Sequence, residues 1–393
     1  MKILQMVSTP PFAWASGGCA RVVYEESRAL SAKGHRVTIL TTDLFEHSRR
    51  YPISINPQII EKIEIYRLKN LSRKLAWKYK LYIVPDIIRF LHRRISEFDV
   101  VHLHDLLSPN AILTSRYCIK KHIPYILTIH GSGRWLLSDD IFKKSITKIF
   151  LNRILQNACK VTALNSTEVY QYREFGVDKD KIIVVPNGIN LKEYDEIPKR
   201  GGFRRRFGLD DNENLILYLG RIHESKGLEI LMEAFNLIKQ ENNDARLVIC
   251  GPDDGYLTRL NKLAIRMNLL DRIIFPGFLT ENMKKLALID ADAFVTPIFY
   301  GFPITFLESW ACGTSIVTTN KGDNIDWINE KVGIVAEYDP IAIKDALMRI
   351  INDKEVKQRF RMNAKEMLEK ELNWDVISKQ LEEIYEECIR DYS

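Results

Sequence analysis

A strand–turn–helix–strand unit at residues 293–320 constrains the fold more than any other stretch of this chain. Its apolar run, Ala293–Thr296, indicates the end of a buried strand. A turn rich in glycine and proline then leads into a helix that Gly313 ends, and Ser315–Thr319 forms the next strand. Such a unit directs the first N–H groups of its helix toward the pocket above the sheet, where they favour an anion. Glu308, about one turn into the helix, is placed to bind a ribose diol, although a capping or surface glutamate explains it equally well.

The same alternation of strand and helix recurs in two series along the chain. One series begins with the apolar strand Lys2–Val7 and the other with Leu215–Leu219. Because 393 residues exceed one typical hydrophobic core, we expect an α/β fold of two domains. The turn-rich segment 190–211, which carries the basic patch Arg204–Arg206, is expected to connect them.

Glycines and histidines mark the candidate ligand loops of the first series. Gly17 and Gly18 follow the first strand and precede a helix, where their backbone can approach a ligand closely or simply form a flexible turn. His130 ends a strand and is followed by glycine, which is where open α/β sheets bind ligands. His102 and His104 share one face of another strand; a metal site there needs a third ligand that the sequence does not reveal, so we expect core or pocket-lining groups.

Two cations flank a strand-to-helix turn in the second series. Arg221 ends the strand, and Lys226 precedes an amphipathic helix. An arginine fork and a lysine point charge at this spacing can clamp a diphosphate, although two ordinary surface cations give the same pattern.

The charge is distributed unevenly. Residues 1–187 carry a net charge of +13 and residues 188–393 a net charge of −7. Segment 67–94 holds nine Lys and Arg residues against one acid, with aromatic and aliphatic residues between them. This composition suits an anionic membrane surface, a nucleic acid or a solvated helix face, but no nucleic-acid recognition motif accompanies it.

Other features favour a cytoplasmic protein. The first residues are broken by prolines too early for a signal peptide, and no apolar run approaches the ~20 residues that span a bilayer. The six cysteines lie far apart, without metal-ligand spacing, and indicate reduced, mostly buried thiols. Segment 67–94 adds the alternative of peripheral attachment to the inner face of the membrane.

Nine pieces, taken in order, resemble the retaining glycosyltransferases of family 4, which have the GT-B fold. They are SGGCARVVYEESRALSAKGHRVTILT, DVVHLHD, PYILTIHGSG, VVPNGIN, LGRIHESKGLEILMEAF, VICGPDDG, IIFPGFL, GFPITFLESWACGTSIVTTNKG and NWDVISKQLEEIYEE. The resemblance implies two doubly wound Rossmann-like domains that face each other across a cleft, at 1–188 and 189–370, with a helix at 371–393 that returns to the first. It also implies transfer of a sugar, with retained configuration, from a UDP- or GDP-sugar to a glycan or lipid-linked acceptor, without a metal or other cofactor.

The resemblance also assigns roles to individual residues. Arg221 and Lys226 match the cations that neutralise the donor diphosphate, Glu308 the glutamate that holds the ribose, and His130 the histidine near the reacting sugar. The remaining matches contact the donor through a loop or the backbone: Gly17 and Gly18 at the phosphate, Phe302, Ile304 and Thr305 through N–H groups, and Phe278 and Leu279 at the nucleobase.

One position departs from the family pattern. Tyr300 stands eight residues before Glu308, where the family usually has a glutamate that contacts the donor sugar. The departure leaves open an unusual donor, a low rate, or another carboxylate from a shifted loop. It also leaves open a weakly active or inactive sugar-binding subunit, while an epimerase on the same fold would not use segment 67–94. For the enzyme, Lys226→Ala or Glu308→Ala is predicted to abolish turnover with little change in thermal stability.

Overall fold

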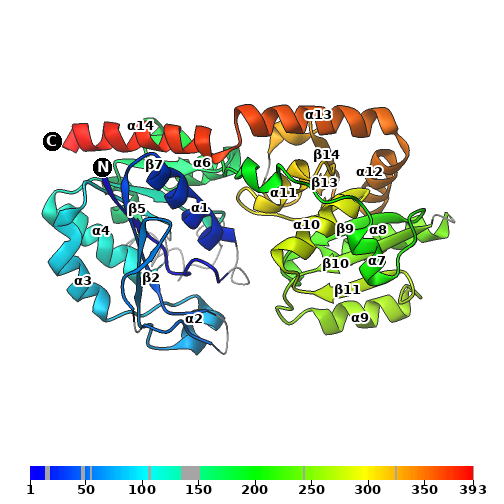
Figure 1. Ribbon diagram of the computed structural model, residues 1–393, viewed down its shortest axis with the longest axis horizontal. Coiled ribbons are helices and arrows are strands. Elements are labelled where there is room, and N and C mark those ends of the chain that lie inside the picture. Colours follow the sequence, from blue (N-terminus) through cyan, green and yellow to red (C-terminus); the bar gives the residue numbers. More distant parts are fainter. Residues whose placement is uncertain are drawn as a thin grey trace. The chain divides into compact units, whose positions relative to one another are not determined.

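The computed structural model describes residues 1–13, 18–45, 49–53, 55–104, 108–133, 151–241, 244–323 and 325–392. The chain forms two compact units (Figure 1). Unit 1 comprises Met1–Gly188 together with Trp374–Ser393, and unit 2 comprises Ile189–Asn373. The last helix therefore belongs to the unit that begins the chain.

Unit 1 is an α/β unit with one sheet. Its strands are β1 (Lys2–Met6), β2 (Arg36–Thr42), β3 (Gln58–Ile60), β4 (Ile63–Leu68), β5 (Val100–Leu103), β6 (Tyr125–Thr128), β7 (Lys160–Ala163) and β8 (Ile182–Val184). Its helices include α1 (Gly18–Ala32), α2 (Arg73–Tyr79), α3 (Asp86–Arg94), α4 (Pro109–Lys121), α6 (Ser166–Glu174) and α14 (Trp374–Tyr392).

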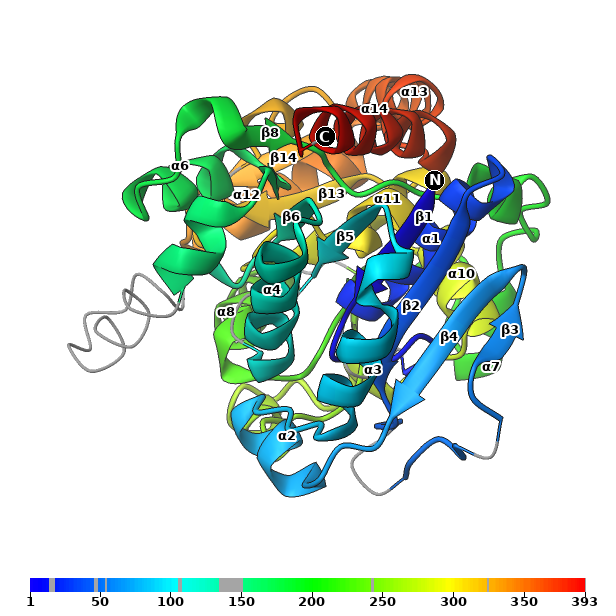
Figure 2. The same cartoon turned by 90° about the vertical axis from the view of Figure 1, so that its left-hand side faces the viewer.

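The strands of unit 1 run in the order β3-β4-β2-β1-β5-β6-β7-β8, and only β3 pairs antiparallel. Because side chains alternate along a strand, Leu4 and Met6 enter a hydrophobic core with α3 and α4, whereas Gln5 points to the other face. Figure 2 shows α3 and α4 side by side over the sheet. Helices α1 and α14 pack against each other and supply Glu26 and Tyr385, which the amide nitrogen of Gln5 contacts.

Unit 2 repeats this organisation. Its strands are β9 (Asn214–Leu219), β10 (Ala245–Cys250), β11 (Ile273–Gly277), β12 (Ala293–Thr296), β13 (Ile316–Thr319) and β14 (Gly333–Ala336). Its helices are α7 (Gly202–Phe207), α8 (Leu228–Gln240), α9 (Leu257–Arg266), α10 (Glu281–Asp290), α11 (Ile304–Ala311), α12 (Pro340–Asn352) and α13 (Lys354–Lys370).

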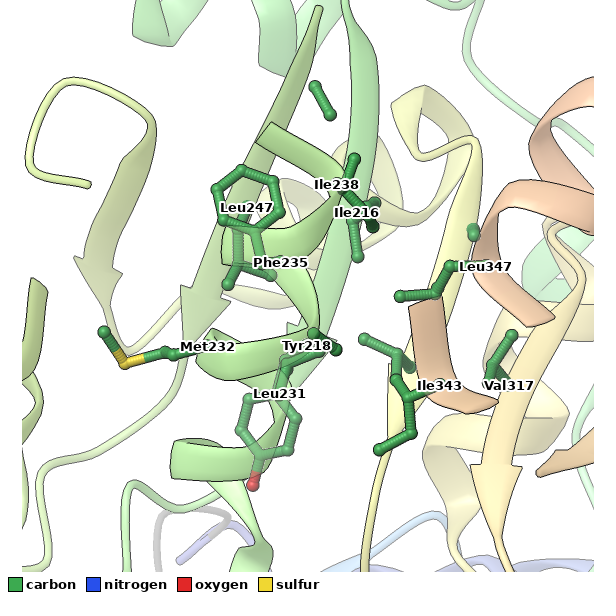
Figure 3. Packing of buried hydrophobic residues seen from close by; sticks show 14 of the residues in the cluster. Ile216, Tyr218, Leu231, Met232, Phe235, Ile238, Leu247, Val317, Ile343 and Leu347 are labelled. Atoms are coloured by element: carbon green, nitrogen blue, oxygen red, sulfur yellow. The ribbon is translucent and has the colours of Figure 1, made fainter. Parts of the chain in front are cut away.

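The sheet of unit 2 is entirely parallel, in the order β11-β10-β9-β12-β13-β14. One face packs on α8 and α12, which supply Phe235 and Leu347 to the core around Ile216 and Val317 (Figure 3). Counted from its first strand, the sheet of unit 2 has the 3-2-1-4-5-6 order of doubly wound nucleotide-binding folds. The parallel strands β4-β2-β1-β5-β6-β7 of unit 1 follow the same order, with β3 and β8 added at the two edges. The predicted α/β class and the doubly wound architecture are confirmed.

The predicted connection at 190–211 is wrong for its second half. Residues 202–207 form α7, which is bound to unit 2, and Arg204 is only 1% exposed. Its guanidinium pairs with Asp292 at 2.9 Å, and Asp290 accepts the N–H group of Arg204 at 2.9 Å. A run of charged residues predicts a solvated surface only where no buried carboxylate is available to pair with it. Here Asp290, at the end of α10, and Asp292, just after it, provide such carboxylates.

Two expectations about the chain as a whole can be compared with the structure. The six cysteines are free, and four of them are buried: Cys118, Cys250, Cys312 and Cys388. Among the described residues, no helix is both long enough and apolar enough to cross a membrane.

Candidate functional site

The strand order reverses at one point in each sheet, between β1 and β5 in unit 1 and between β9 and β12 in unit 2. Ligands of doubly wound folds bind beside this point, at the carboxyl ends of the strands. In unit 2 the loop after β9 carries Arg221 and Lys226, and the loop after β12 carries Tyr300. The topology therefore brings together the two predicted cations and the residue that departs from the family pattern.

The predicted cation pair lies on a short turn between β9 and α8. Arg221 extends from it and pairs with Asp254 at 2.5 Å. Lys226 ends a 3₁₀ turn, and Gly227 follows with φ +69°. A Cβ at Gly227 would lie 3.0 Å from Cβ of Pro297, so only glycine gives both this backbone conformation and this close approach of the two loops.

Lys226 has a perturbed environment. Burial, reinforced by the nearby Arg221 charge, lowers the pKa of its ammonium to about 8, and Asp323 opposes the shift. The ammonium lies 5.6 Å from the centre of the Tyr300 ring. A poorly hydrated cation near an aromatic ring interacts strongly with any anion that enters. Lys226 is therefore the strongest candidate for an anion-binding group in unit 2.

Asp323 is a residue that sequence reasoning missed. It is 3% exposed, and its carboxylate accepts the N–H group of Gly301 at 2.6 Å. Its own N–H group donates to the carbonyl of Phe299 at 3.0 Å. Asp323 thus fixes the loop that carries Tyr300 and places a negative charge close to Lys226. A Gly-Asp pair shortly after a strand at the same sheet edge is the signal that could have identified it.

Helix α11 begins next to this loop, as the sequence predicts. Its first residues are Ile304 and Thr305, whose N–H groups have no intrahelical acceptor because they lie in the first turn. Phe302 is buried, with its ring edge-on to Trp327 at 5.9 Å between centres. The Phe302 side chain therefore anchors the turn, and any contact it makes with a ligand is through the backbone.

Glu308 lies within α11 and is 1% exposed. Its carboxylate forms an ion pair with Lys284 of α10 at 2.6 Å. Lys284 also contacts Glu281 at 2.9 Å. This geometry argues against the prediction that Glu308→Ala leaves thermal stability almost unchanged, because removing one partner of a buried ion pair is destabilising. Glu308→Gln preserves size and hydrogen bonding and is the better variant.

The predicted nucleobase loop follows β11. Phe278 is a large apolar side chain that is 55% exposed, and Leu279 beside it is partly exposed. An exposed aromatic ring at the carboxyl end of a strand offers a stacking surface for a planar base.

His130 follows β6 in unit 1 and has φ +48°, in the left-handed region that residues other than glycine rarely adopt. Glu168 of α6 is fully buried and accepts the N–H group of the next residue, Gly131, as well as that of Leu164 at 2.7 Å. A strained backbone held by a buried carboxylate is typical of functional loops. His130 also lines a small cavity with His102 and Asn187.

His130 is one end of a buried hydrogen-bond network. Its Nε2 lies 2.9 Å from Nδ1 of His104, whose Nε2 lies 2.5 Å from Oε1 of Gln5. The Gln5 amide nitrogen donates to Oε1 of Glu26 at 2.8 Å. The Tyr385 hydroxyl, from the last helix, donates to the same oxygen at 2.9 Å.

The network contains one ionised acid, Glu26, and two histidines with lowered pKa values, His104 and His130. Burial opposes ionisation of Glu26, but His102 and the hydrogen bonds from Tyr385 and Gln5 outweigh it and lower the pKa of the carboxyl. Burial lowers the pKa of His104 well below its usual value, with His102 and His130 adding to the shift. Burial also lowers the pKa of His130 to about 4. At neutral pH both imidazoles are therefore uncharged.

The third ligand that the sequence did not reveal beside His102 and His104 is present. Glu26 lies close enough to both for the three to hold a metal ion, within the part of the chain that the structure describes. However, every ring nitrogen of the two histidines already has a hydrogen-bond partner: Glu26, Tyr385 and Thr128 for His102, and His130 and Gln5 for His104. The hydrogen bonds alone account for the cluster, as expected of core polar groups.

Comparison with known proteins identifies the family. A family model described as "Glycosyl transferases group 1" matches residues 200–367, and one described as "Glycosyltransferase Family 4" matches residues 16–193. The chain belongs to the group 1 glycosyltransferases. It is an enzyme that transfers sugars, as the resemblance implied.

One curated relative is an uncharacterized glycosyltransferase of Methanocaldococcus jannaschii, which is 27% identical over 94% of each chain. Sucrose-phosphate synthase of Thermosynechococcus elongatus has a similar structure, with a TM-score of 0.78, 20% identity and full coverage of both chains. The Anabaena protein HepE, solved with UDP and glucose, gives a TM-score of 0.77 at 15% identity, over 98% of this chain and 100% of that one. These structures confirm the GT-B fold.

The remaining predicted positions of this glycosyltransferase lie in unit 1. Gly18 is exposed and begins α1, whereas Gly17 lies outside the described residues. Segment 67–94 forms the end of β4 and helices α2 and α3. Its basic residues differ in environment: Arg67 is buried against the Tyr51 ring, whereas Lys69 is exposed.

Proposed function

We propose that this glycosyltransferase retains the anomeric configuration and needs no metal, and that it moves a sugar from a UDP- or GDP-sugar to a glycan or lipid-linked acceptor. The observation that carries the proposal is that Arg221 and the desolvated Lys226 lie on one loop, at the point where the strand order of unit 2 reverses and beside the start of α11. These groups supply the positive charge and the N–H donors that a diphosphate requires.

The chemistry follows from where charge develops. As the bond between the anomeric carbon and the diphosphate oxygen breaks, negative charge accumulates on the departing diphosphate and an oxocarbenium-like centre forms. Lys226 and Arg221 stabilise that charge. The acceptor oxygen bonds to the anomeric carbon on the face that the diphosphate leaves, and its proton passes to a diphosphate oxygen. His130 would contact the transferred sugar, and Glu308 the ribose.

Asp323 offers a reason why Tyr300 can replace the usual glutamate. Asp323 lies in the loop after β13, and its carboxylate accepts the N–H group of Gly301 in the loop that carries Tyr300 and raises the pKa of Lys226. We propose that Asp323 supplies the negative charge that a glutamate at the position of Tyr300 usually provides in this family. This is the alternative, raised by the sequence, that a different loop contributes the carboxylate. Tyr300 would contribute its ring face and a hydroxyl hydrogen bond.

The donor is tested by thermal shift with UDP, GDP and ADP and their sugars. Phe278 provides a stacking surface but does not select a base, and HepE was solved with UDP. A ligand at one hundred times its Kd stabilises by about 2.7 kcal/mol, so a true donor raises Tm by several degrees. Lys226→Ala should lose the shift. The proposal fails if no nucleotide shifts Tm, or if the variant responds as the wild type does.

Two further measurements test the mechanism. Proton NMR of the product gives the anomeric coupling, and inversion of the donor configuration contradicts front-face transfer. Turnover after treatment with EDTA should equal that of untreated enzyme, because Lys226 and Arg221 occupy the role of the metal. Loss of turnover that Mg²⁺ or Mn²⁺ restores contradicts metal independence.

A lipid-linked acceptor is proposed from the surface of segment 67–94. This surface exposes apolar side chains among cations: Leu71, Tyr79, Leu81 and Ile88 with Lys69, Arg73, Lys74, Lys80, Arg89 and Arg93. Its chemistry suits an anionic lipid headgroup region. The enzyme should sediment with vesicles containing phosphatidylglycerol and not with neutral vesicles, and Leu71→Ser/Tyr79→Ser should weaken binding. Equal sedimentation with both vesicle types, or with neither, contradicts the proposal.

A further inference from the structure

In the buried network of unit 1, the donor and the acceptor of each hydrogen bond are fixed in turn, starting from the acid Glu26. Ionised Glu26 can only accept hydrogen bonds, so Gln5 must turn its NH₂ group toward it and its oxygen toward His104. Nε2 of His104 must then carry the proton that Gln5 accepts. Because His104 is neutral, its Nδ1 is an acceptor.

His130 is the last member of this chain. Its Nε2 faces the acceptor Nδ1 of His104 at 2.9 Å and must therefore carry a proton. Because His130 is also neutral at pH 7, its Nδ1 keeps a lone pair, to which no described residue donates a hydrogen bond. The tautomer of His130 is thus fixed by a carboxylate three hydrogen bonds away.

We propose that Glu26, Gln5 and His104 are positioning residues that hold His130 in the tautomer whose Nδ1 accepts a hydrogen bond from a sugar hydroxyl. The proposal rests on the proposed contact between His130 and the transferred sugar. A histidine whose tautomer is set cannot turn a donor N–H toward the hydroxyl, so the hydroxyl must act as donor.

Glu26→Gln tests the relay without touching His130. A neutral amide at position 26 can donate as well as accept, so Gln5 can rotate and donate to His104. His104 then carries its proton on Nδ1 and donates to His130, which must move its own proton to Nδ1. Tyr385→Phe is the matched control, because it removes another hydrogen bond to the same Glu26 oxygen without changing the direction of the chain.

The measurement is the ¹H–¹⁵N spectrum of full-length protein labelled at histidine, recorded at pH 7.5. The signals of His130 are identified by their loss in His130→Asn. Wild type and Tyr385→Phe should show the proton on Nε2, and Glu26→Gln should show a population with the proton on Nδ1. A proton on Nδ1 of His130 in the wild type overturns the relay, even where Glu26→Gln and Tyr385→Phe do not fold. An unchanged tautomer in folded Glu26→Gln also overturns it.

Turnover separates this proposal from the proposed function. We expect kcat of Glu26→Gln to fall about tenfold, which corresponds to the loss of one hydrogen bond to the sugar, while the donor KM stays within a factor of two. A changed tautomer with unchanged kcat supports the relay but contradicts the sugar contact of His130. An unchanged tautomer with lower kcat contradicts the relay alone.

Discussion

The two units share the strand order around the point where it reverses, but the side chains placed there are neutral histidines in unit 1 and cations in unit 2. Residues 1–187 carry a net charge of +13, yet His104 and His130 are held neutral. Residues 188–393 carry −7, yet the loop after β9 places the two cations Arg221 and Lys226 at the carboxyl edge of the sheet. The local environment at the end of a strand, and not the net charge of that half of the chain, decides which chemistry each sheet can support.

The largest expected effect comes from removing the cation of unit 2. Lys226→Ala should lower kcat by ~10²–10³, because one preorganised contact to the leaving group is lost. Tm should change by less than a few degrees, since Lys226 stabilises no ion pair that the core depends on. The control is Lys331→Ala, which removes an exposed cation of the same unit. A kcat of Lys226→Ala within a few-fold of wild type would contradict the assignment of a cationic, leaving-group-binding site to unit 2.

The dependence of kcat/KM on pH tests whether the charge of Lys226 is required. The pKa of Lys226 is lowered to about 8, so the ammonium is present below that pH and lost above it. The donor kcat/KM, which reports the free enzyme, should therefore fall by about tenfold per pH unit above this point. Lys226→Arg keeps its charge over the whole range and should remove the break. A break that persists in Lys226→Arg belongs to another group.

Asp323→Asn should produce a smaller shift of that profile. The Asp323 carboxylate raises the pKa of Lys226, so neutralising it moves the break to lower pH and lowers kcat/KM a few-fold at pH 8. Asparagine can still accept the N–H group of Gly301, so the loop is preserved. Asp254→Asn, at the exposed partner of Arg221, is the matched control and should leave the break in place. An unmoved break in Asp323→Asn contradicts the proposed role of Asp323.

The smallest expected effect is the acid sensitivity of unit 1. The folded-state pKa values of His104 and His130 lie below the unfolded value near 6.5, so the unfolded chain binds more protons as the pH falls. The contribution of these two histidines to the free energy of unfolding should be fully present above pH 6.5 and should decrease toward pH 4.5. His104→Gln should flatten this decrease, and exposed His122→Asn should not. Identical slopes for the two variants would contradict the assignment.

Patterns local in sequence predicted much of the fold. The strand Ala293–Thr296 has the predicted bounds because an uninterrupted apolar run marks it, and the next helix ends just before Gly313, as predicted. The loop that carries Arg221 and Lys226 was also predicted, since glycine marks the end of the strand before it.

Contacts between distant residues could not be predicted. The partners of His102 lie 76 residues away at Glu26 and 283 residues away at Tyr385, and no periodicity connects them. Arg204 and Asp292 are 88 residues apart, and the burial of that pair is set by tertiary packing. Asp323 belongs to a different βα loop from the one it stabilises, so its role appears only once the sheet is assembled.

The placement of Tyr385 on α14 has a consequence for biosynthesis. The first unit is closed by a helix that is translated after all of the second unit, so the histidine network lacks its Tyr385 hydrogen bonds while the nascent chain is still shorter than 385 residues. Unit 2 can complete its sheet before α14 is translated, whereas the network around His130 becomes complete only after Tyr385 has been added to the chain.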